Sequence, residues 1–503
     1  MRLNPALIDR IAQDYRLTPA TLAHKLDPTW IPADHLMYIS ARVASGIQRG
    51  GARIIISLPP RHGKSRLLSI GTSTWVLEKF PTRNVILSSY GADLSEEFSS
   101  KVRDQITRNP QLLKVRLRAD SSRVDRFKTT EDGGLAAVGL GGAITGRGAD
   151  VLFIDDYIKE IKEALSDTYR DYLWNWFTTT AMTRLEPNAS VIIIATRWHI
   201  DDLIGRILVN FPGEWEYIQI PAIANENDLL GRRPGTALFP ERYPIDRLDE
   251  MKRLLGSHFF AAVYQQDPEG DDSRLSNRGW VQITDELPHP EFLQWARVWD
   301  LAATDGGGDY TVGGLYAADV RHKNMYTTQI VRKQLSPHAV EKLVAEMAEK
   351  DGPSVPIYIE QEPGASGKAL VEHYQRNVLK DYKVIPVPAT KAKVTRAHPL
   401  LAGAEWGRFY LLRAAWNEPF LREFDLFGHK SDHDDQVDTA AIAWLKLIGK
   451  EIMSPTWGRT KKTAEDFKQG MRSTGVVSGV VWGRKTAASR VPHRPAHTGV
   501  ILR

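Results

Sequence analysis

The sequence predicts an α/β protein made of two successive sheet-based domains, on three observations. The chain has 503 residues, which is too long for one ordinary hydrophobic core. Short apolar runs rich in Ile and Val alternate with helix-like segments, a pattern typical of mostly parallel sheets covered on both faces. The alternation breaks up in a Pro- and Gly-rich stretch and then resumes. We therefore expect a first domain over 51–266, a linker over 267–292 and a second domain over 293–450.

Helices are expected over 1–50, leading into the first domain, because apolar residues recur at helical spacing at 7–11 and a second helix candidate runs over 32–47. Within that domain the β-branched runs predict buried strands at 53–58, 84–88, 151–154, 190–195 and 217–220. A helix is expected at 246–255, inside the interrupted stretch. The second domain opens with three strand candidates and then alternates, with strands at 295–301, 310–317, 324–331, 355–359 and 383–387 and helices at 337–350 and 368–378.

The composition is that of a soluble globular protein, with 42% hydrophobic and 25% charged residues. The sequence predicts neither a membrane span nor a secretory signal, since no long apolar run exists. The absence of cysteine excludes disulfides and thiolate zinc sites and is compatible with a reducing cytoplasm. The net charge of +5 is unevenly spread, because 451–503 carries ten Lys and Arg against three Asp and Glu. We expect a basic, flexible tail there, with a DNA- or partner-contacting arm as the alternative.

A phosphate-binding loop is predicted at the end of the first strand. The strand at 53–58 leads into a tight loop that ends in Gly-Lys-Ser, and backbone N–H groups of such a loop wrap a β-phosphate. The match is imperfect, because Leu58 stands where the motif has its first Gly. Lys64 would reach the β- and γ-phosphates of ATP, and the Ser65 hydroxyl would hold Mg²⁺. The predicted nucleotide-binding residues of the loop are Pro60, Arg61, His62, Gly63, Lys64 and Ser65.

Two acids end the strand at 151–154, where a P-loop ATPase carries its Walker B carboxylate. Asp155 would bind Mg²⁺ through its water shell, and Asp156 would polarise the attacking water. Because that second role is more often filled by the longer Glu, Glu160 and Glu163 remain alternatives. The competing interpretation is a solvated acidic pair at a strand end.

Three arginines suit a nucleotide site of this kind. Arg61 would lean over the γ-phosphate from within the loop, and Arg147 would reach a neighbouring subunit as an arginine finger. Thr196 and Arg197 follow a strand and are placed to sense the γ-phosphate. Each arginine is otherwise ordinary surface charge. The first half therefore predicts a P-loop ATPase domain of the ASCE or RecA-like type, with a mostly parallel sheet.

The second half predicts a metal-dependent nuclease. Asp300 and Glu360 end apolar strands, while Asp435 and Asp438 are three residues apart on one face of a helix. Two-metal phosphodiester cleavage needs several carboxylates from separate elements, and this combination suits a ribonuclease-H-like α/β domain. Each acid alone is more often structural. The oxygen ligands accept Mg²⁺ or Mn²⁺.

Further residues surround these four acids. Asp309 is an outer acid of the metal site or a hairpin residue. Lys391, Lys393 and Arg396 would neutralise phosphates of the strand being cut.

The motifs taken together resemble those of the large terminase subunit of tailed bacteriophages and prophages, over roughly 30–448. In the first half they are 59–65, 145–150, 154–156, 195–199, 237–242 and 264–268, and in the second half 299–300, 309–311, 359–360, 393–397 and 433–438. The resemblance assigns Lys64, Ser65 and Asp155 to the nucleotide and Mg²⁺ by position. It assigns Thr196 and Arg197 to the coupling of hydrolysis to movement. Asp156 is a departure, because many relatives carry Glu there.

In the second half the resemblance assigns Asp300, Glu360 and Asp438 to the metal ions, with Asp435 where the family has Asp or His. It implies a motor that translocates double-stranded DNA through a portal into a procapsid and cuts concatemeric DNA. The implied partners are the portal protein and the small terminase subunit, and a homo-oligomeric ring would form on the portal. The implied location is the host bacterial or archaeal cytoplasm, with no membrane partner and no place in the mature virion.

Two other classes of protein compete with this interpretation. A helicase or restriction-type translocase would also pair an ATPase with a nuclease, but the sequence lacks the second RecA-like half that such proteins use. A single half predicts self-assembly, with the site completed by a neighbour's Arg147. A decayed prophage protein acting as a DNA-binding scaffold is the third class, and the intact Lys64, Asp155 and Asp300 argue against it.

Overall fold

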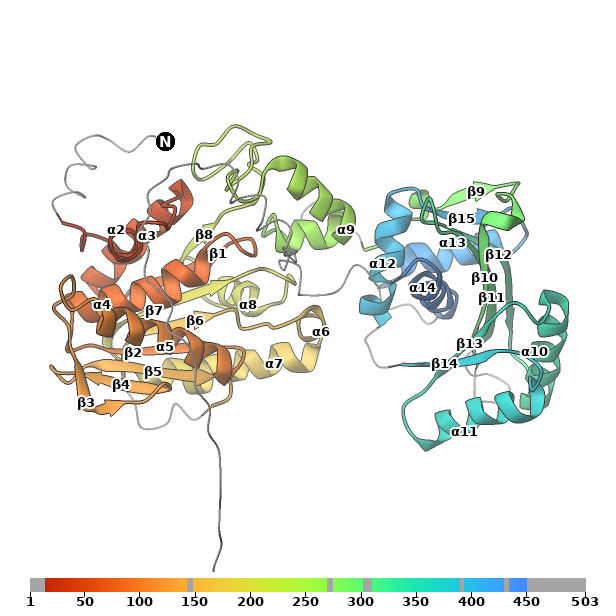
Figure 1. The fold of residues 1–503 in the computed structure, drawn as a ribbon, viewed down its shortest axis with the longest axis horizontal. Helices are drawn as coiled ribbons and strands as arrows, with labels where there is room; N and C mark the ends of the chain where they lie inside the picture. The colour runs from red at the N-terminus through yellow and green to blue at the C-terminus, as the bar shows by residue number, and fades with distance from the viewer. Residues whose placement is uncertain are drawn as a thin grey trace, which may run out of the picture. The chain divides into compact units, whose positions relative to one another are not determined.

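The computed structural model describes residues 14–142, 148–268, 275–301, 310–389, 393–428 and 434–449. The chain divides into two units, Met1–Ile452 and Met453–Arg503, and the predicted basic tail lies outside the described residues. Two separate sheets form within the first unit (Figure 1). Among the described residues, no helix combines the length and apolar character needed to cross a bilayer.

The first sheet has eight strands in the order β3-β4-β5-β2-β6-β7-β1-β8. The last five strands of this order, β2, β6, β7, β1 and β8, pair in parallel with one another, and β5 pairs in parallel with β2. The hairpin strands β3 and β4 add antiparallel pairs at one edge. The strands are β1 Arg53–Ser57, β2 Asn84–Ser89, β3 Leu117–Ser122, β4 Arg126–Thr129, β5 Gly134–Gly139, β6 Ala149–Asp155, β7 Leu185–Ala195 and β8 Glu216–Gln219.

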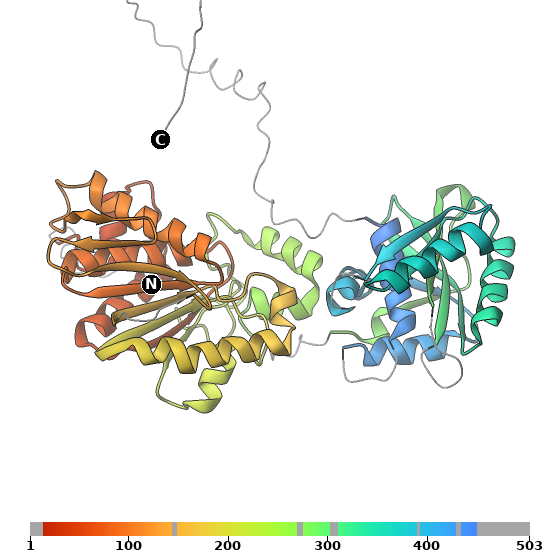
Figure 2. The same cartoon turned by 90° about the horizontal axis from the view of Figure 1, so that it is seen from below.

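Helices cover both faces of this sheet, as the sequence predicts (Figure 1 and Figure 2). One hydrophobic core lies between one face and the helices of the first hundred residues, and a second core lies under α7 and α8. The helices are α2 Pro19–Leu26, α3 Asp34–Arg49, η1 Arg66–Thr72, α4 Ser73–Lys79, α5 Ala92–Arg108, α6 Ile161–Ala164, α7 Asp167–Trp176, η2 Phe177–Ala181, η3 Met182–Arg184 and α8 Leu203–Asn210. The helix over 32–47 is confirmed as α3, while the one expected at 7–11 lies outside the described residues.

A smaller cluster of apolar side chains follows the sheet in sequence. It packs α9, Ile245–Val263, against Ala222 and Ala237. The predicted helix at 246–255 is therefore longer in the structure, and it changes direction at Gly256, whose φ of 67° is not helical.

The second sheet has seven strands in the order β14-β13-β10-β11-β12-β15-β9. Its centre is an antiparallel meander of β10, β11 and β12, and the outer strands add in parallel on both sides. The strands are β9 Gln282–Thr284, β10 Leu293–Asp300, β11 Thr311–Asp319, β12 Asn324–Lys333, β13 Ile357–Gln361, β14 Val384–Pro388 and β15 Phe409–Leu412. The helices are η4 Arg278–Trp280, η5 Pro290–Phe292, α10 Pro337–Asp351, α11 Ala365–His373, η6 Tyr374–Val378, α12 Lys393–Glu405, α13 Asn417–Leu426 and α14 Asp435–Leu447.

Both faces of the second sheet are also covered. One core contains α12, α13 and α14, and the other contains α10 and α11. A mixed sheet with an antiparallel centre and helices on both faces agrees with the ribonuclease-H-like α/β arrangement that the sequence predicts.

Candidate active sites

The strand order of the first sheet brings three predicted site segments together. β7 lies between β6 and β1, and the pairs Ser57↔Ala195 and Asp155↔Ile194 align the ends of these strands. The loop that follows β1, the acids that end β6 and Thr196, which follows β7, therefore meet at one edge. Ligands of open parallel sheets bind at this carboxyl edge.

Lys64 is the centre of this first site. Its ammonium group donates to the Asp156 carboxylate and, over 2.6 Å, to the hydroxyl of Thr196. The Thr196 hydroxyl in turn donates to the carbonyl of Leu58 over 3.1 Å. Lys64 is buried, so its charge is balanced within the protein by Asp156.

Asp155 is fully buried beside this pair. Its Oδ2 accepts a hydrogen bond from the Ser69 hydroxyl over 2.5 Å, while its Oδ1 has no hydrogen-bond partner. Burial and the neighbouring Asp156 carboxylate raise the pKa of Asp155 to about 7. A buried carboxylate oxygen with no partner fits a hard divalent cation, which prefers oxygen ligands.

The two alternative bases lie on the segment that leads into α6. The Glu163 carboxylate accepts a hydrogen bond from the backbone N–H of Lys159 over 2.7 Å, and Glu160 is exposed at the start of the helix. Asp156 itself has a φ of 44° and donates its N–H to the Ile194 carbonyl over 2.9 Å. The carboxylate that contacts Lys64 is thus the one from Asp156.

The loop residues divide into exposed and buried ones. Arg61 is exposed with a φ of 64°, whereas the His62 ring has no exposed surface and stacks on Tyr243 at 4.8 Å. The His62 Nδ1–H donates to the Pro60 carbonyl over 2.8 Å. The His62 ring therefore supports the loop from behind, which leaves the backbone of this residue for the predicted contact with a phosphate.

Gly63 is fixed by its surroundings. Its φ is 90°, and a Cβ atom at this position would lie 2.9 Å from the Cδ1 atom of Leu36. Next to it a cavity of about 270 Å³ is lined by residues that include Trp30, Phe239 and Arg242. Phe239 and Arg242 belong to the sequence motif at 237–242, so this motif lies beside the phosphate-binding loop. A second cavity, of about 580 Å³, lies beside Ser65.

The two residues predicted to sense the γ-phosphate face different surroundings. Thr196 contacts Lys64, but the guanidinium of Arg197 forms a buried ion pair with Asp202 at 2.8 Å and donates to the Tyr217 hydroxyl over 3.3 Å. Arg197 is therefore engaged within the protein rather than directed at Lys64. The predicted finger Arg147 lies outside the described residues.

The second site forms where β10 and β13 end side by side. Trp299 and Ile359 are paired in parallel, so the residues that follow them, Asp300 and Glu360, lie side by side on adjacent strands. Asp435 and Asp438 lie in the first turn of α14, which packs against β10. Burial, then the charges of Glu360, Asp435 and Asp438, raise the pKa of Asp300 to about 8. The structure thus brings the four predicted acids together.

Two basic residues of α12 enter this acidic site. Arg396 donates to Glu360 Oε1 over 2.5 Å and to Asp438 Oδ1 over 3.2 Å, while Lys393 pairs with Asp434 and with Asp438. Burial raises the pKa of Asp438 to about 6 despite these two cations. Arg396 therefore acts as a cationic bridge between acids that come from a strand and from a helix.

The side chains of the second site are chemically suited to bind a divalent cation. The four acids offer only oxygen ligands, and Glu360 Oε2 is buried with no hydrogen-bond partner. Within the described ranges no three acidic or histidine side chains gather as a complete ligand set, and the guanidinium of Arg396 joins two of the acids instead. The further candidates Asp309 and Lys391 lie outside the described residues.

Two family models match the chain in sequence. Residues 55–268 match the model described as terminase large subunit, T4likevirus-type, N-terminal, and residues 297–447 match the terminase RNaseH-like domain. Comparison with curated proteins finds no match.

Solved structures of bacteriophage proteins resemble the chain at low identity. The large terminase from a thermophilic bacteriophage, in complex with ATP-gamma-S, is 12% identical and covers 83% of this chain and 100% of its own, with a TM-score of 0.47. The HK97 bacteriophage large terminase is 13% identical and covers 79% of this chain and 89% of its own, with a TM-score of 0.35. The large terminase nuclease from thermophilic phage G20c, with bound zinc, is 17% identical and covers 35% of this chain and 99% of its own, with a TM-score of 0.27.

The two family models cover most of the chain, and each coincides with one of the two sheets and its acidic site. The chain therefore belongs to the large terminase subunits, the ATPases and nucleases that package the DNA of tailed bacteriophages.

Proposed function

We propose that the two sites have separate tasks in packaging, ATP hydrolysis at Lys64 and DNA cleavage at Asp300. The observation that carries this proposal is that each sheet has its own group of acids at the ends of its strands, and each group has its own cation in contact with it. Lys64 contacts Asp156 in the first cluster, and Arg396 joins Glu360 to Asp438 in the second.

At the first site Lys64 would bind the β- and γ-phosphates of ATP, and the backbone of 60–65 would wrap the β-phosphate. Asp155 and the Ser65 hydroxyl would hold Mg²⁺. The Asp156 carboxylate contacts Lys64. A phosphate that binds Lys64 would displace this carboxylate, which would then orient the attacking water. Arg61, exposed on the loop, and Arg147 of a neighbouring subunit would stabilise charge on the transferred phosphoryl group.

At the second site Asp300, Glu360, Asp435 and Asp438 would hold two divalent cations, Mg²⁺ or Mn²⁺. Such cations stabilise the attacking and the leaving oxygens of a phosphodiester. The acids would orient the ions, and Arg396 and Lys393 would turn from the acids to the phosphates of the strand being cut.

The partners follow from the task of the family. The chain would assemble as a ring on the portal of a procapsid, bind double-stranded DNA there and receive it from a small terminase subunit. This would take place in the cytoplasm of the bacterial or archaeal host, and the protein would not remain in the mature virion.

A DNase-protection assay tests this proposal. Purified protein is mixed with procapsids that carry a portal, linear double-stranded DNA, ATP and Mg²⁺, and DNA inside the capsid survives DNase. We expect protection with the wild type and with Asp300→Asn, since linear DNA needs no cut to enter, and none with Lys64→Ala. Protection by Lys64→Ala would overturn the role of the first site.

A further inference from the structure

The motif at 264–268 directly follows α9, and through Gln266 it contacts the segment after β7, which also carries Thr196. We propose that Gln266 is a positioning residue of the ATPase site, which holds Thr196 in contact with Lys64. The proposal rests on the proposed roles of Lys64 and Thr196 in ATP hydrolysis.

The connection between Gln266 and Lys64 is short. Gln266 Oε1 accepts a hydrogen bond from the backbone N–H of Arg197 over 3.0 Å. The residue before it, Thr196, accepts from the ammonium group of Lys64 over 2.6 Å. Gln266 therefore fixes the peptide that joins Thr196 to Arg197, although it does not touch the nucleotide loop itself.

Gln266 is itself held firmly. It has no exposed surface, and its φ of 60° is a left-handed conformation that a residue other than glycine rarely adopts. Its side-chain amide donates to the carbonyl of Val263, and its own carbonyl accepts from Gln219 Nε2 over 2.9 Å. A buried glutamine with both ends of its side-chain amide bonded to the backbone is built to hold its acceptor oxygen at a fixed point.

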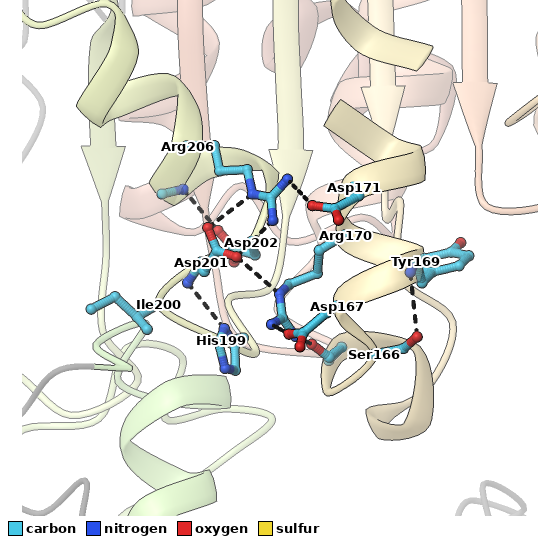
Figure 3. Close-up of polar contacts among 12 residues, drawn as sticks. Ser166, Asp167, Tyr169, Arg170, Asp171, His199, Ile200, Asp201, Asp202 and Arg206 are labelled. Carbon is cyan, nitrogen blue, oxygen red and sulfur yellow. Dashed lines mark hydrogen bonds and ion pairs between the residues drawn. The ribbon is translucent and has the colours of Figure 1, made fainter. Parts of the chain in front are cut away.

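The rest of the loop after β7 is held by charged residues. Asp202 pairs with Arg197 and accepts from the Gly205 N–H at the start of α8. Asp201 accepts from Arg206 over 2.7 Å and pairs with Arg170 of α7 at 3.2 Å (Figure 3). These ion pairs fix 199–202 against α7 and α8, whereas the Thr196 end of the loop is fixed by Gln266.

Gln265 provides a matched control. Its side chain makes the same kind of paired contact with a backbone, accepting from the N–H of Ile223 over 2.9 Å and donating to the carbonyl of Ile223 over 3.0 Å. Ile223 lies in the segment after β8 and does not adjoin Thr196 in the chain. Gln265→Met and Gln266→Met thus remove two comparable clamps, only one of which reaches the ATP site.

The experiment measures steady-state ATP hydrolysis and thermal unfolding of the full chain in both variants. For Gln266→Met we expect kcat to fall about tenfold with KM for ATP changed less than about twofold, because misplacing a positioned group costs rate rather than binding. For Gln265→Met we expect both constants to stay within about twofold of the wild type at a similar loss of melting temperature. Equal losses of kcat in the two variants, or none in Gln266→Met, would overturn the proposal.

Two additions keep the test decisive. If Gln266→Met does not fold, the pair Gln266→Asn and Gln265→Asn gives the same comparison, because Asn keeps both polar groups and loses reach. A double variant with Thr196→Val should be no slower than Thr196→Val alone, since the two residues would act through one contact. Multiplicative losses would contradict that. A wild type that does not hydrolyse ATP would refute the proposed ATPase site instead.

Discussion

The two acidic sites of this chain balance their charge in different ways. In the ATPase site a single cation, Lys64, contacts Asp156, and the deeper Asp155 is held by the hydroxyl of Ser69. In the nuclease site Arg396 joins Glu360 to Asp438 directly, and Lys393 adds a second cation to Asp438.

This difference determines which contacts of each site have to change when a nucleotide or a metal ion binds. Lys64 can keep its place while a phosphate replaces the Asp156 carboxylate, since both are anions. Arg396 stands between two acids that are proposed to bind cations, so a metal ion competes with the guanidinium. The ATPase site is therefore prepared for an anion, and the nuclease site has to exchange one cation for others.

The largest expected effect concerns Lys64. Lys64→Ala should lower ATP turnover by about a thousandfold, because it removes the charge placed on the transferred phosphates. A phosphate-release assay measures this. Arg118→Ala, which removes a surface partner of Asp120 on β3, should leave turnover unchanged. Retained ATP turnover in Lys64→Ala would contradict the role of Lys64 as the phosphate-binding cation of the ATPase site.

Arg396→Met should destabilise the metal-free protein by about 3 kcal/mol, because it leaves the buried Glu360 and Asp438 without their shared cation. Urea unfolding with and without Mn²⁺ measures this, and Mn²⁺ should stabilise the variant more than the wild type. The control is Arg376→Met, whose partner Glu372 forms an exposed pair. An equal response to Mn²⁺ in the wild type and Arg396→Met would show that the guanidinium does not compete with metal.

Asp300→Asn should stabilise the metal-free protein by about 2 kcal/mol at pH 8. The pKa of this acid is raised to about 8 by burial and by its acidic neighbours, so its ionisation opposes folding increasingly as the pH rises from about 4 to 8. Asn removes that cost. A melting curve in EDTA at pH 8 and at pH 5 measures the gain, which should shrink at the lower pH. A variant less stable than the wild type at pH 8 would contradict this account of the site.

The smallest expected effect lies behind the ATP loop. Burial lowers the pKa values of His35 and His62 to about 4, and each ring has one buried nitrogen with no hydrogen-bond partner. Below pH 6.5 these histidines become protonated in the unfolded chain but stay neutral in the native state. The free energy of unfolding should therefore fall by about 1 kcal/mol per histidine between pH 7 and 5.5. Urea unfolding at the two pH values measures the loss. His35→Gln should reduce it, whereas Gln at the exposed His338 should not.

Much of the fold could be predicted from the sequence. Buried parallel strands such as β1 and β2 are short runs of Ile, Val and Leu, which stand out against their surroundings. The hairpin strand β3 was not predicted, because Leu117–Ser122 is mostly polar and shows no apolar alternation. The short strands β9 and β15 were also missed, since three or four residues carry too little pattern.

The candidate sites were predicted in part. Asp155, Asp300 and Glu360 could be predicted as site residues, because each is an acid that directly follows an apolar run in the sequence. The orientation of His62 depends on its packing against Tyr243, which is distant in the chain, so the motif alone did not reveal it. Gln266 was likewise hidden, because its contact with Arg197 exists only once β7 and α9 are folded together.

The most direct test of two independent sites is one pair of assays on three proteins. ATP hydrolysis and cleavage of supercoiled plasmid, with Mg²⁺ or Mn²⁺, are measured for the wild type, Lys64→Ala and Asp300→Ala. We expect Lys64→Ala to lose hydrolysis and keep cleavage, and Asp300→Ala to lose cleavage and keep hydrolysis. Loss of both activities in either folded variant, or cleavage that survives in Asp300→Ala, would contradict the assignment of one task to each sheet.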